Sequence, residues 1–406
     1  MLVARGDGES GANGGSRQRA NARGPGIPGR RERANDLDFE FSSEQDALRD
    51  SVRRFLADRA PITFVREMLD DERGTTDAVW QGLADLGATG LLVPEAHGGA
   101  GMGMVDIAVV VEELGRALHP GPFASSAVGA VSLITLAGDE RDRAAFLPAL
   151  ASGEHVGAIA VYESGRRHRF DAPTTTAAAA GDGWTLDGTK VHVADVTGSD
   201  LLLVTATTGD DIGIYAVESG TEGVSITPSP TVDGTHKEGE VTLRGATARR
   251  LGGADALGAL HETFDRLHTA AVVDGVGAAD RALELAVEYA KERQQFGVPV
   301  GSFQAVQHLC TDMLRAVELA RAAGYYACWA ADAADAAERH RAATMALAFA
   351  ADELYGVGAS AIQVHAGIGC TWEHDVGLFY KRLLTLQQTG GGSHAALEEL
   401  ATIALG

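Results

Sequence analysis

The sequence from Tyr289 to Gln307, YAKERQQFGVPVGSFQAVQ, contains a tight corner between two long segments with helical patterning. Regularly spaced apolar side chains before it predict a helix that runs up to Phe296-Gly297. Glycine readily takes the left-handed conformation that ends helices, and Pro299 prevents an immediate restart. Arg293 is therefore expected in the last turn of the first helix.

The side chains around this corner suit a nucleotide. Arg293 offers a planar fork of donors, which can bind a pyrophosphate bidentately. Gln295 and Gln304 offer amides and Phe296 an aromatic edge, which suit an adenosine. The residues alone leave one alternative open, a helical hairpin whose arginine forms a surface ion pair.

The composition excludes several classes of partner. The chain has 406 residues, 45% of them hydrophobic, and a formal net charge of -22. We expect so acidic a chain to bind neither nucleic acid nor anionic membranes. Its three cysteines (Cys310, Cys328 and Cys370) lie far apart, so no disulfide framework and no metal site are predicted. We expect no membrane-spanning run and no signal peptide, and therefore a cytoplasmic protein.

Patterning divides the chain into four regions. Residues 1–35 lack apolar periodicity and are expected either to form a disordered tail or to result from a start codon assigned too far upstream. Residues 36–153 show helical patterns only and predict an α-helical N-terminal domain. Residues 154–253 contain short strand-like runs at regular spacing, which predict a small β-barrel or sandwich. Within them, Asp187-Gly188 is expected to be the turn of a hairpin.

Residues 254–406 are helical again. The expected helices are His261–Arg293, Ser302–Ala333, Ala337–Gln363 and a last one from Ser393. Four helices of this length with Ala-rich sides predict an antiparallel bundle.

The corner motif R-x-x-F-G-x-P-[IV]-x-x-[FH]-Q resembles the flavin contact segment of the acyl-CoA dehydrogenases. The run VPEAHGGAGMGMVDIAVVVEELGRAL at residues 93–118 is similar to their N-terminal helical domain. Gln363, Val364 and Gly367 lie in a segment that resembles the family's QxxGGxG motif, which contacts the ADP part of the flavin. The resemblance extends from about Asp38 to the end of the chain. It implies an α-helical N-terminal domain, a central β-barrel, a C-terminal four-helix bundle, and FAD as cofactor.

The resemblance also implies a partner. In the family, the residues matching this corner hold the ADP end of an FAD that the neighbouring subunit mainly binds. The run TWEHD at Thr371–Asp375 resembles especially the actinobacterial branch that acts on steroid side-chain thioesters and pairs two different subunits. We therefore expect a homologous acyl-CoA dehydrogenase subunit as partner in a heterotetramer, with a homo-oligomer as the alternative.

The base that the family's chemistry requires is missing. Dehydrogenation of an acyl-CoA needs a carboxylate to remove the α-proton. The resemblance places that Glu at Gly390 in one arrangement and at Leu267 in the other, and neither is an acid. No catalytic residue is therefore assigned. His192 and His365 are candidate replacements, although a lone histidine is more often packed or solvated.

The positions that would hold the flavin ring are altered as well. His192 stands where the family has a ring-stacking Trp, and Ala194 where it has a hydroxyl that bonds the ring. Of the family's Thr-Glu-Pro-x-x-Gly-Ser-Asp loop, Glu163 and Gly165 are recognisable. The basic run Arg166–Arg169 is a candidate site for a CoA phosphate.

These features together predict the base-lacking subunit of a heteromeric, FAD-dependent acyl-CoA dehydrogenase that forms a 2,3-enoyl-CoA. Its expected contribution is the ADP-side clamp, while the partner supplies the base. Two alternatives remain, a self-sufficient enzyme with a displaced base and a non-catalytic scaffold.

Overall fold

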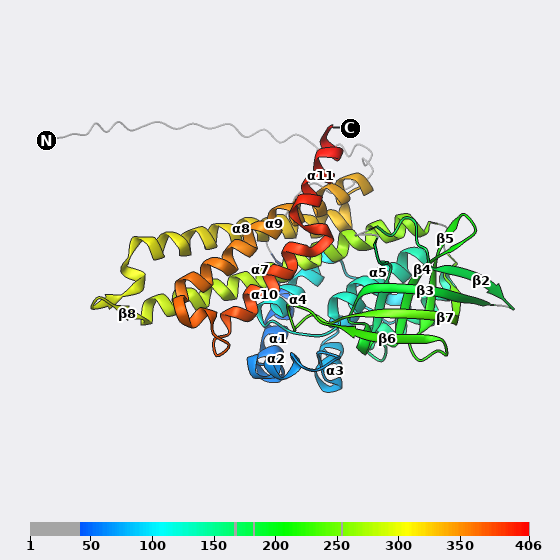
Figure 1. Cartoon of the computed structure of the whole chain (residues 1–406), viewed down its shortest axis with the longest axis horizontal. Coiled ribbons are helices and arrows are strands. Elements are labelled where there is room, and N and C mark those ends of the chain that lie inside the picture. The colour runs from blue at the N-terminus through cyan, green and yellow to red at the C-terminus, as the bar shows by residue number, and fades with distance from the viewer. Residues whose placement is uncertain (1–40, 166–168, 182, 253–254, 406) are drawn as a thin grey trace, which may run out of the picture. The chain divides into compact units, whose positions relative to one another are not determined.

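The computed structural model describes residues 41–165, 169–181, 183–252 and 255–405. The tail expected over residues 1–35 lies outside these ranges. From Ser42 onward, helices come first, a sheet follows, and a second set of helices ends the chain (Figure 1).

The first region is helical. Its α-helices are α1 (Ser43–Arg59), α2 (Ile62–Met68), α3 (Asp77–Asp85), α4 (Met104–Arg116), α5 (Val131–Ala137) and α6 (Glu140–Ala151). Ser42 begins α1 with a capping box, since its hydroxyl accepts from Gln45 N while the Gln45 side chain accepts from Ser42 N. The apolar side of α4 is buried and packs against the long helix α7 (Ala256–Glu292).

The second region is a seven-stranded sheet that closes on itself. Its strands are β1 (Gly157–Ala160), β2 (Thr176–Ala180), β3 (Gly183–Ala194), β4 (Leu201–Thr208), β5 (Asp211–Glu218), β6 (Val224–Ser229) and β7 (Glu238–Arg250). β4 pairs with β1, β2 and β5, β5 pairs with β7, and β7 pairs with β3, which pairs with β2. The expected β-barrel is thereby confirmed.

The hairpin expected at Asp187-Gly188 is wrong, because β3 runs through it with only a shift in register. Asp187 Oδ1 accepts a hydrogen bond from the backbone N–H of Gly245 in the neighbouring strand β7, 2.8 Å away. A Cβ at Gly188 would lie 2.5 Å from Thr175 Oγ1. This glycine therefore allows a close approach between backbones and does not form a turn.

The third region is a helical bundle. Besides α7 it contains α8 (Gln304–Ala333), α9 (Ala336–His365), α10 (Val376–Gln388) and α11 (Gly392–Leu405). α7 packs against α8, α9 and α10, so α10 is the fourth helix of the bundle, while α11 lies mainly against α9. The predicted fourth helix from Ser393 is α11, and α10 was missed because its sequence was assigned to the expected catalytic loop.

α9 is the one described helix long and apolar enough, by length and composition alone, to cross a bilayer. Half of its most apolar window is buried inside the protein, which is the environment of a bundle core helix. The expectation that no run reaches this length was therefore wrong for α9, and its packing explains the apolar composition.

A buried arginine joins the three regions. Arg382 on α10 is 2% exposed and contacts Asp274 on α7 at 2.8 Å and Asp233 before β7 at 3.0 Å. Its guanidinium also donates to Thr235 Oγ1 and to the carbonyl of His119, which follows α4. Arg382 holds the pKa of Asp233 below its usual range against the opposing effect of burial.

Replacing Arg382 by Met should lower the free energy of unfolding by about 3–5 kcal/mol, because the substitution leaves buried carboxylates without their counter-charge. The difference can be measured by urea denaturation. Arg315→Met is the matched control, since Arg315 pairs with Glu353 on the exposed face of the bundle and should contribute less than about 1 kcal/mol. Equal destabilisation by the two substitutions would contradict the joining role of Arg382.

Candidate functional site

The corner between α7 and α8 is a short β-hairpin. α7 ends at Glu292, and β8 (Gln294–Gln295) pairs with β9 (Val298–Pro299). Phe296 and Gly297 turn between them with φ of 56° and 82°, the positive values that a tight hairpin turn requires. The helix therefore ends before Arg293 and not at Phe296-Gly297 as predicted, which moves Arg293 just beyond the last turn.

The candidate clamp residues at this corner all reach the surface. Arg293, Gln295, Phe296 and Gln304 are exposed, and Phe296 is 92% exposed. Gln295 Nε2 donates to the carbonyl of Gln294. Among the described residues, neither Arg293 nor Gln304 has a side-chain hydrogen bond or ion pair, so the alternative of a surface ion pair at Arg293 finds no partner there.

The second clamp segment lies at the same end of the bundle. His365, at the end of α9, has its ring centroid 4.7 Å from that of Tyr289 near the end of α7. Gln363 and Gly367 are exposed beside it, whereas Val364 is buried in the bundle core. In Figure 1, β8 and this end of the bundle lie at the opposite end of α7 from the sheet. The structure thus places the two candidate clamp segments at the same end of the bundle. The side chain of Val364 is buried, so only its backbone could contact a cofactor there.

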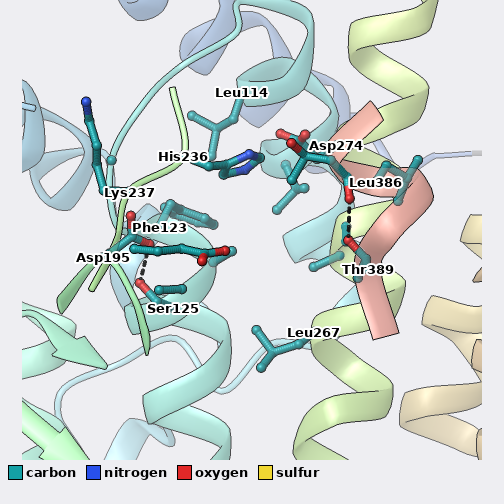
Figure 2. Close-up of a pocket in the computed structure, with 18 of the residues that line it drawn as sticks. Leu114, Phe123, Ser125, Asp195, His236, Lys237, Leu267, Asp274, Leu386 and Thr389 are labelled. Carbon is teal, nitrogen blue, oxygen red and sulfur yellow. Dashed lines mark hydrogen bonds between the residues drawn. The ribbon is translucent and has the colours of Figure 1, made fainter. Parts of the chain in front are cut away.

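A cavity of about 270 Å³ lies where α4, the end of β3, α7 and α10 converge. We call it the junction cavity. Figure 2 shows Ser125 and Asp195 on one wall of this cavity and Leu386 and Thr389 on the opposite wall. Leu267 on α7 points toward the wall that carries Ser125. A larger opening of about 880 Å³ shares several of its lining residues and reaches Gly390. Both positions of the missing acid therefore border one connected space.

The ring-side wall of this space is polar and partly strained. His192 and Asp195 both have positive φ, at 52° and 54°. The His192 ring is 72% exposed and its Nδ1 lies 3.0 Å from a Glu238 carboxylate oxygen. Asp195 accepts a hydrogen bond from Ser125 Oγ at 2.7 Å, and burial raises its pKa to about 6. Ala194 between them offers only a methyl group.

Glu163 serves the structure of the barrel. Its carboxylate accepts from Lys190 Nζ at 2.8 Å and from the backbone and hydroxyl groups of Thr174 and Thr175. Burial opposes these bonds, but together they lower the pKa of Glu163 to about 2. Of the basic run, residues 166–168 lie outside the described ranges, and Arg169 pairs with Asp171 at 2.8 Å.

The two histidines considered as replacement bases differ in position. His192 borders the junction cavity, but His365 is 1% exposed at the clamp end and donates from Nδ1 to the Ala361 carbonyl. The sequence analysis did not identify a third histidine near these positions, His268. A Cβ built on Gly390 would lie 3.0 Å from His268 Nε2, so this imidazole stands beside the missing acid. The sequence feature that could have identified His268 is its position directly after Leu267, where the resemblance places the acid.

Behind His268 lies another cavity of about 270 Å³, closed by α9 and α11. His340 bridges two carboxylates there, with Nδ1 2.8 Å from Asp265 and Nε2 3.0 Å from Glu399. The hydrogen bond to Asp265, and then that to Glu399, raise the pKa of His340 to about 10. No group of three His, Cys, Asp or Glu side chains within the described ranges is arranged to hold a metal ion.

Two family models match the chain, the acyl-CoA dehydrogenase N-terminal domain over residues 42–154 and the acyl-CoA dehydrogenase C-terminal domain over residues 257–405. The chain belongs to the acyl-CoA dehydrogenase family. Acyl-CoA dehydrogenase FadE34 of Mycobacterium tuberculosis is 34% identical over 89% of this chain, which spans 48% of the length of that relative. FAD is the cofactor of the family.

Two solved acyl-CoA dehydrogenase structures share the fold. A variant of the Tcur3481-Tcur3483 steroid ACAD matches with a TM-score of 0.81 and 32% identity over 89% of this chain and 98% of its own. The ChsE4-ChsE5 complex from Mycobacterium tuberculosis matches with a TM-score of 0.80 and 26% identity over 91% and 99%. The predicted fold and family are therefore confirmed.

The residues of this chain fit one half of FAD. At the clamp end, the exposed Arg293 fork and the Gln304 amide have donors available for a pyrophosphate and a nucleoside. At the junction cavity, a flavin ring would meet the carboxylates of Asp195 and Glu238 and the methyl group of Ala194. These side chains supply neither the stacking surface nor the hydroxyl expected of a ring site.

The His340 bridge should make stability pH-dependent. The pKa of His340 is raised from 6.5 to about 10, so its contribution is fully present below about pH 6.5 and is lost as the pH rises through about 10. We expect the thermal midpoint to fall over this interval, and to fall less in His340→Gln. His394→Gln, at an exposed histidine of α11, is the control and should follow the wild type. An identical fall in His340→Gln and wild type would contradict the assignment.

Proposed function

We propose that this chain is a subunit of a heteromeric, FAD-dependent acyl-CoA dehydrogenase that converts an acyl-CoA to a 2,3-enoyl-CoA. It contributes the ADP-side clamp of an FAD, formed by Arg293, Gln295, Phe296, Gln304 and the Gln363–Gly367 segment. A homologous partner subunit seats the ring of that FAD and supplies the carboxylate base. The assembly is cytoplasmic.

The observation that carries this proposal is the position of the clamp. Its donors are exposed at the end of the bundle, at the opposite end of α7 from the sheet that borders the chain's own junction cavity (Figure 1). A clamp placed there serves a cofactor whose ring lies in another subunit. The exposed Phe296 and Phe303 rings, 6.2 Å apart, add an apolar surface that an adenine and a second subunit would cover.

The chain's own cavity supports the same division of roles. Leu267 borders it and Gly390 borders the larger opening beside it, both without an acid, and His192 and Ala194 stand at the positions of the ring contacts. One subunit of a heteromeric enzyme is expected to keep the clamp residues while it lacks the acid and the contacts to the flavin ring. A pure scaffold has no need of the unpaired donors at Arg293 and Gln304.

The similar structures support a partner and a substrate class. Both the Tcur3481-Tcur3483 steroid ACAD and the ChsE4-ChsE5 complex carry two differently named proteins. We extend both features to this chain and propose a heterotetramer that acts on a steroid side-chain thioester. The three cysteines are free thiols, as a reducing compartment requires.

Arg293→Ala should strip FAD from the assembly, because a desolvated bidentate arginine contact is worth roughly 2–4 kcal/mol, or about 30- to 1000-fold in affinity. Lys should rescue poorly, since it offers a point charge without a fork. FAD content per chain after gel filtration is the measurement. Arg315→Ala, on the exposed face of α8, is the control and should retain FAD. Unchanged FAD in Arg293→Ala would remove Arg293 from the clamp.

Expression of the chain alone separates the heteromer from a homo-oligomer and from a self-sufficient enzyme. We expect colourless or insoluble protein, because the ring contacts are altered and the apolar side chains of Phe296, Phe303 and Leu314 remain exposed. Absorbance of the purified protein in the flavin bands is the readout. A soluble yellow protein with one FAD per chain would overturn the heteromeric proposal.

A further inference from the structure

We propose that His268 accepts the α-proton of an acyl thioester bound in the larger opening beside this chain's junction cavity. The proposal goes beyond the clamp and rests, for its substrate class, on the proposed acyl-CoA dehydrogenase function. The clamp and His268 use different parts of the chain, so either assignment can fail while the other stands.

His268 lies between the two positions at which the family places its acid. It follows Leu267 directly on α7, and its Nε2 lies 3.0 Å from where a Cβ on Gly390 would be. It also lines the same opening as Leu267, Thr389 and Gly390. A Cβ at position 390 would press on this imidazole, which would have to shift by a few tenths of an ångström.

The absence of an acid at position 390 and the presence of the imidazole are therefore linked. Gly390 has a φ of 62°, a conformation that side-chain-bearing residues rarely adopt. A Cβ there would also press on Leu347 Cδ2 at 3.0 Å. Glycine therefore leaves the His268 ring undisturbed in its present position beside the opening.

Charged and titratable groups surround the His268 ring. Those that line the same two cavities are Tyr162, Glu163, Arg169, Asp171, His192, Glu238, His261, Asp265, His340 and Glu399. The pKa of Glu399 is lowered chiefly by its hydrogen bond to His340, and further by the charges of His268 and His261.

The opening can hold the thioester that the step requires. Phe264, Leu267 and Val191 give it apolar walls beside His268. In the step, the Cα–H bond breaks, the proton moves to Nε2, and the electron pair passes to the thioester oxygen as an enolate. Solvent can return the proton. This half-reaction needs no oxidant, so it can be measured separately from dehydrogenation.

Acetoacetyl-CoA is a suitable probe, because its acidic α-carbon forms an enolate that absorbs in the near ultraviolet and it undergoes no oxidation here. The full chain, in whatever assembly it is recovered, is titrated with the probe. We expect His268→Gln to remove about one equivalent of bound enolate per copy of the chain, and His268→Glu to restore it at lower pH. Calorimetry should show that His268→Gln still binds the probe within a few-fold. His394→Gln is the control and should match the wild type.

Three results would overturn the proposal. The first is absence of enolate with the wild-type chain, and the second is a full enolate signal in His268→Gln. The third is loss of binding and enolate together in His268→Gln, which would assign the residue to binding. FAD content measured on the same samples tests the clamp separately, so a failure of one proposal is distinguishable from a failure of the other.

Discussion

The contact of Arg382 with Asp233 and Asp274 determines how the helices meet the sheet. A buried arginine is expensive to desolvate, and this one is compensated by two carboxylates, a hydroxyl and a backbone carbonyl from different segments. It fixes α10 against α7 and against the segment before β7 at one point. The neighbouring His119 is kept neutral, because burial and then the charge of Arg382 lower its pKa to about 3. The junction cavity forms beside this point.

Around the cavity, the backbone and the side chains point to different roles. The end of β3 keeps two non-glycine residues, His192 and Asp195, in the left-handed region. Such residues cost of order 1–3 kcal/mol each and are typical of ligand sites. The side chains carried by this backbone nevertheless lack the stacking ring and the hydroxyl of a flavin site. The cavity therefore combines backbone strain of the kind found at ligand sites with side chains that do not suit a flavin ring.

Periodicity predicted the helical regions and the strand region, but it left a barrel and a sandwich open. The resemblance to the acyl-CoA dehydrogenases implied the barrel, and the closed sheet confirms it. The clamp stays a prediction. The errors arose where tertiary contacts decide the outcome. β3 runs through Asp187-Gly188 because β7 and Thr175 hold it, and α10 is a helix because Phe379, Leu383 and Leu386 are buried in the bundle. His268 was missed because its role depends on Gly390, which is 122 residues away in the chain and adjacent only in the fold.

Photolabelling from both ends of the cofactor can test whether one FAD is shared, with its ADP end on this chain and its ring in a partner. The assembly recovered through a tag on this chain is loaded with FAD that carries an azide on the adenine, or with FAD that carries an azide on the flavin ring. The adenine azide should label this chain near Phe296 or Gln363, and the ring azide should label the partner. If both azides labelled this chain, with the ring azide on residues of the junction cavity, the sharing of one FAD between two subunits would be contradicted.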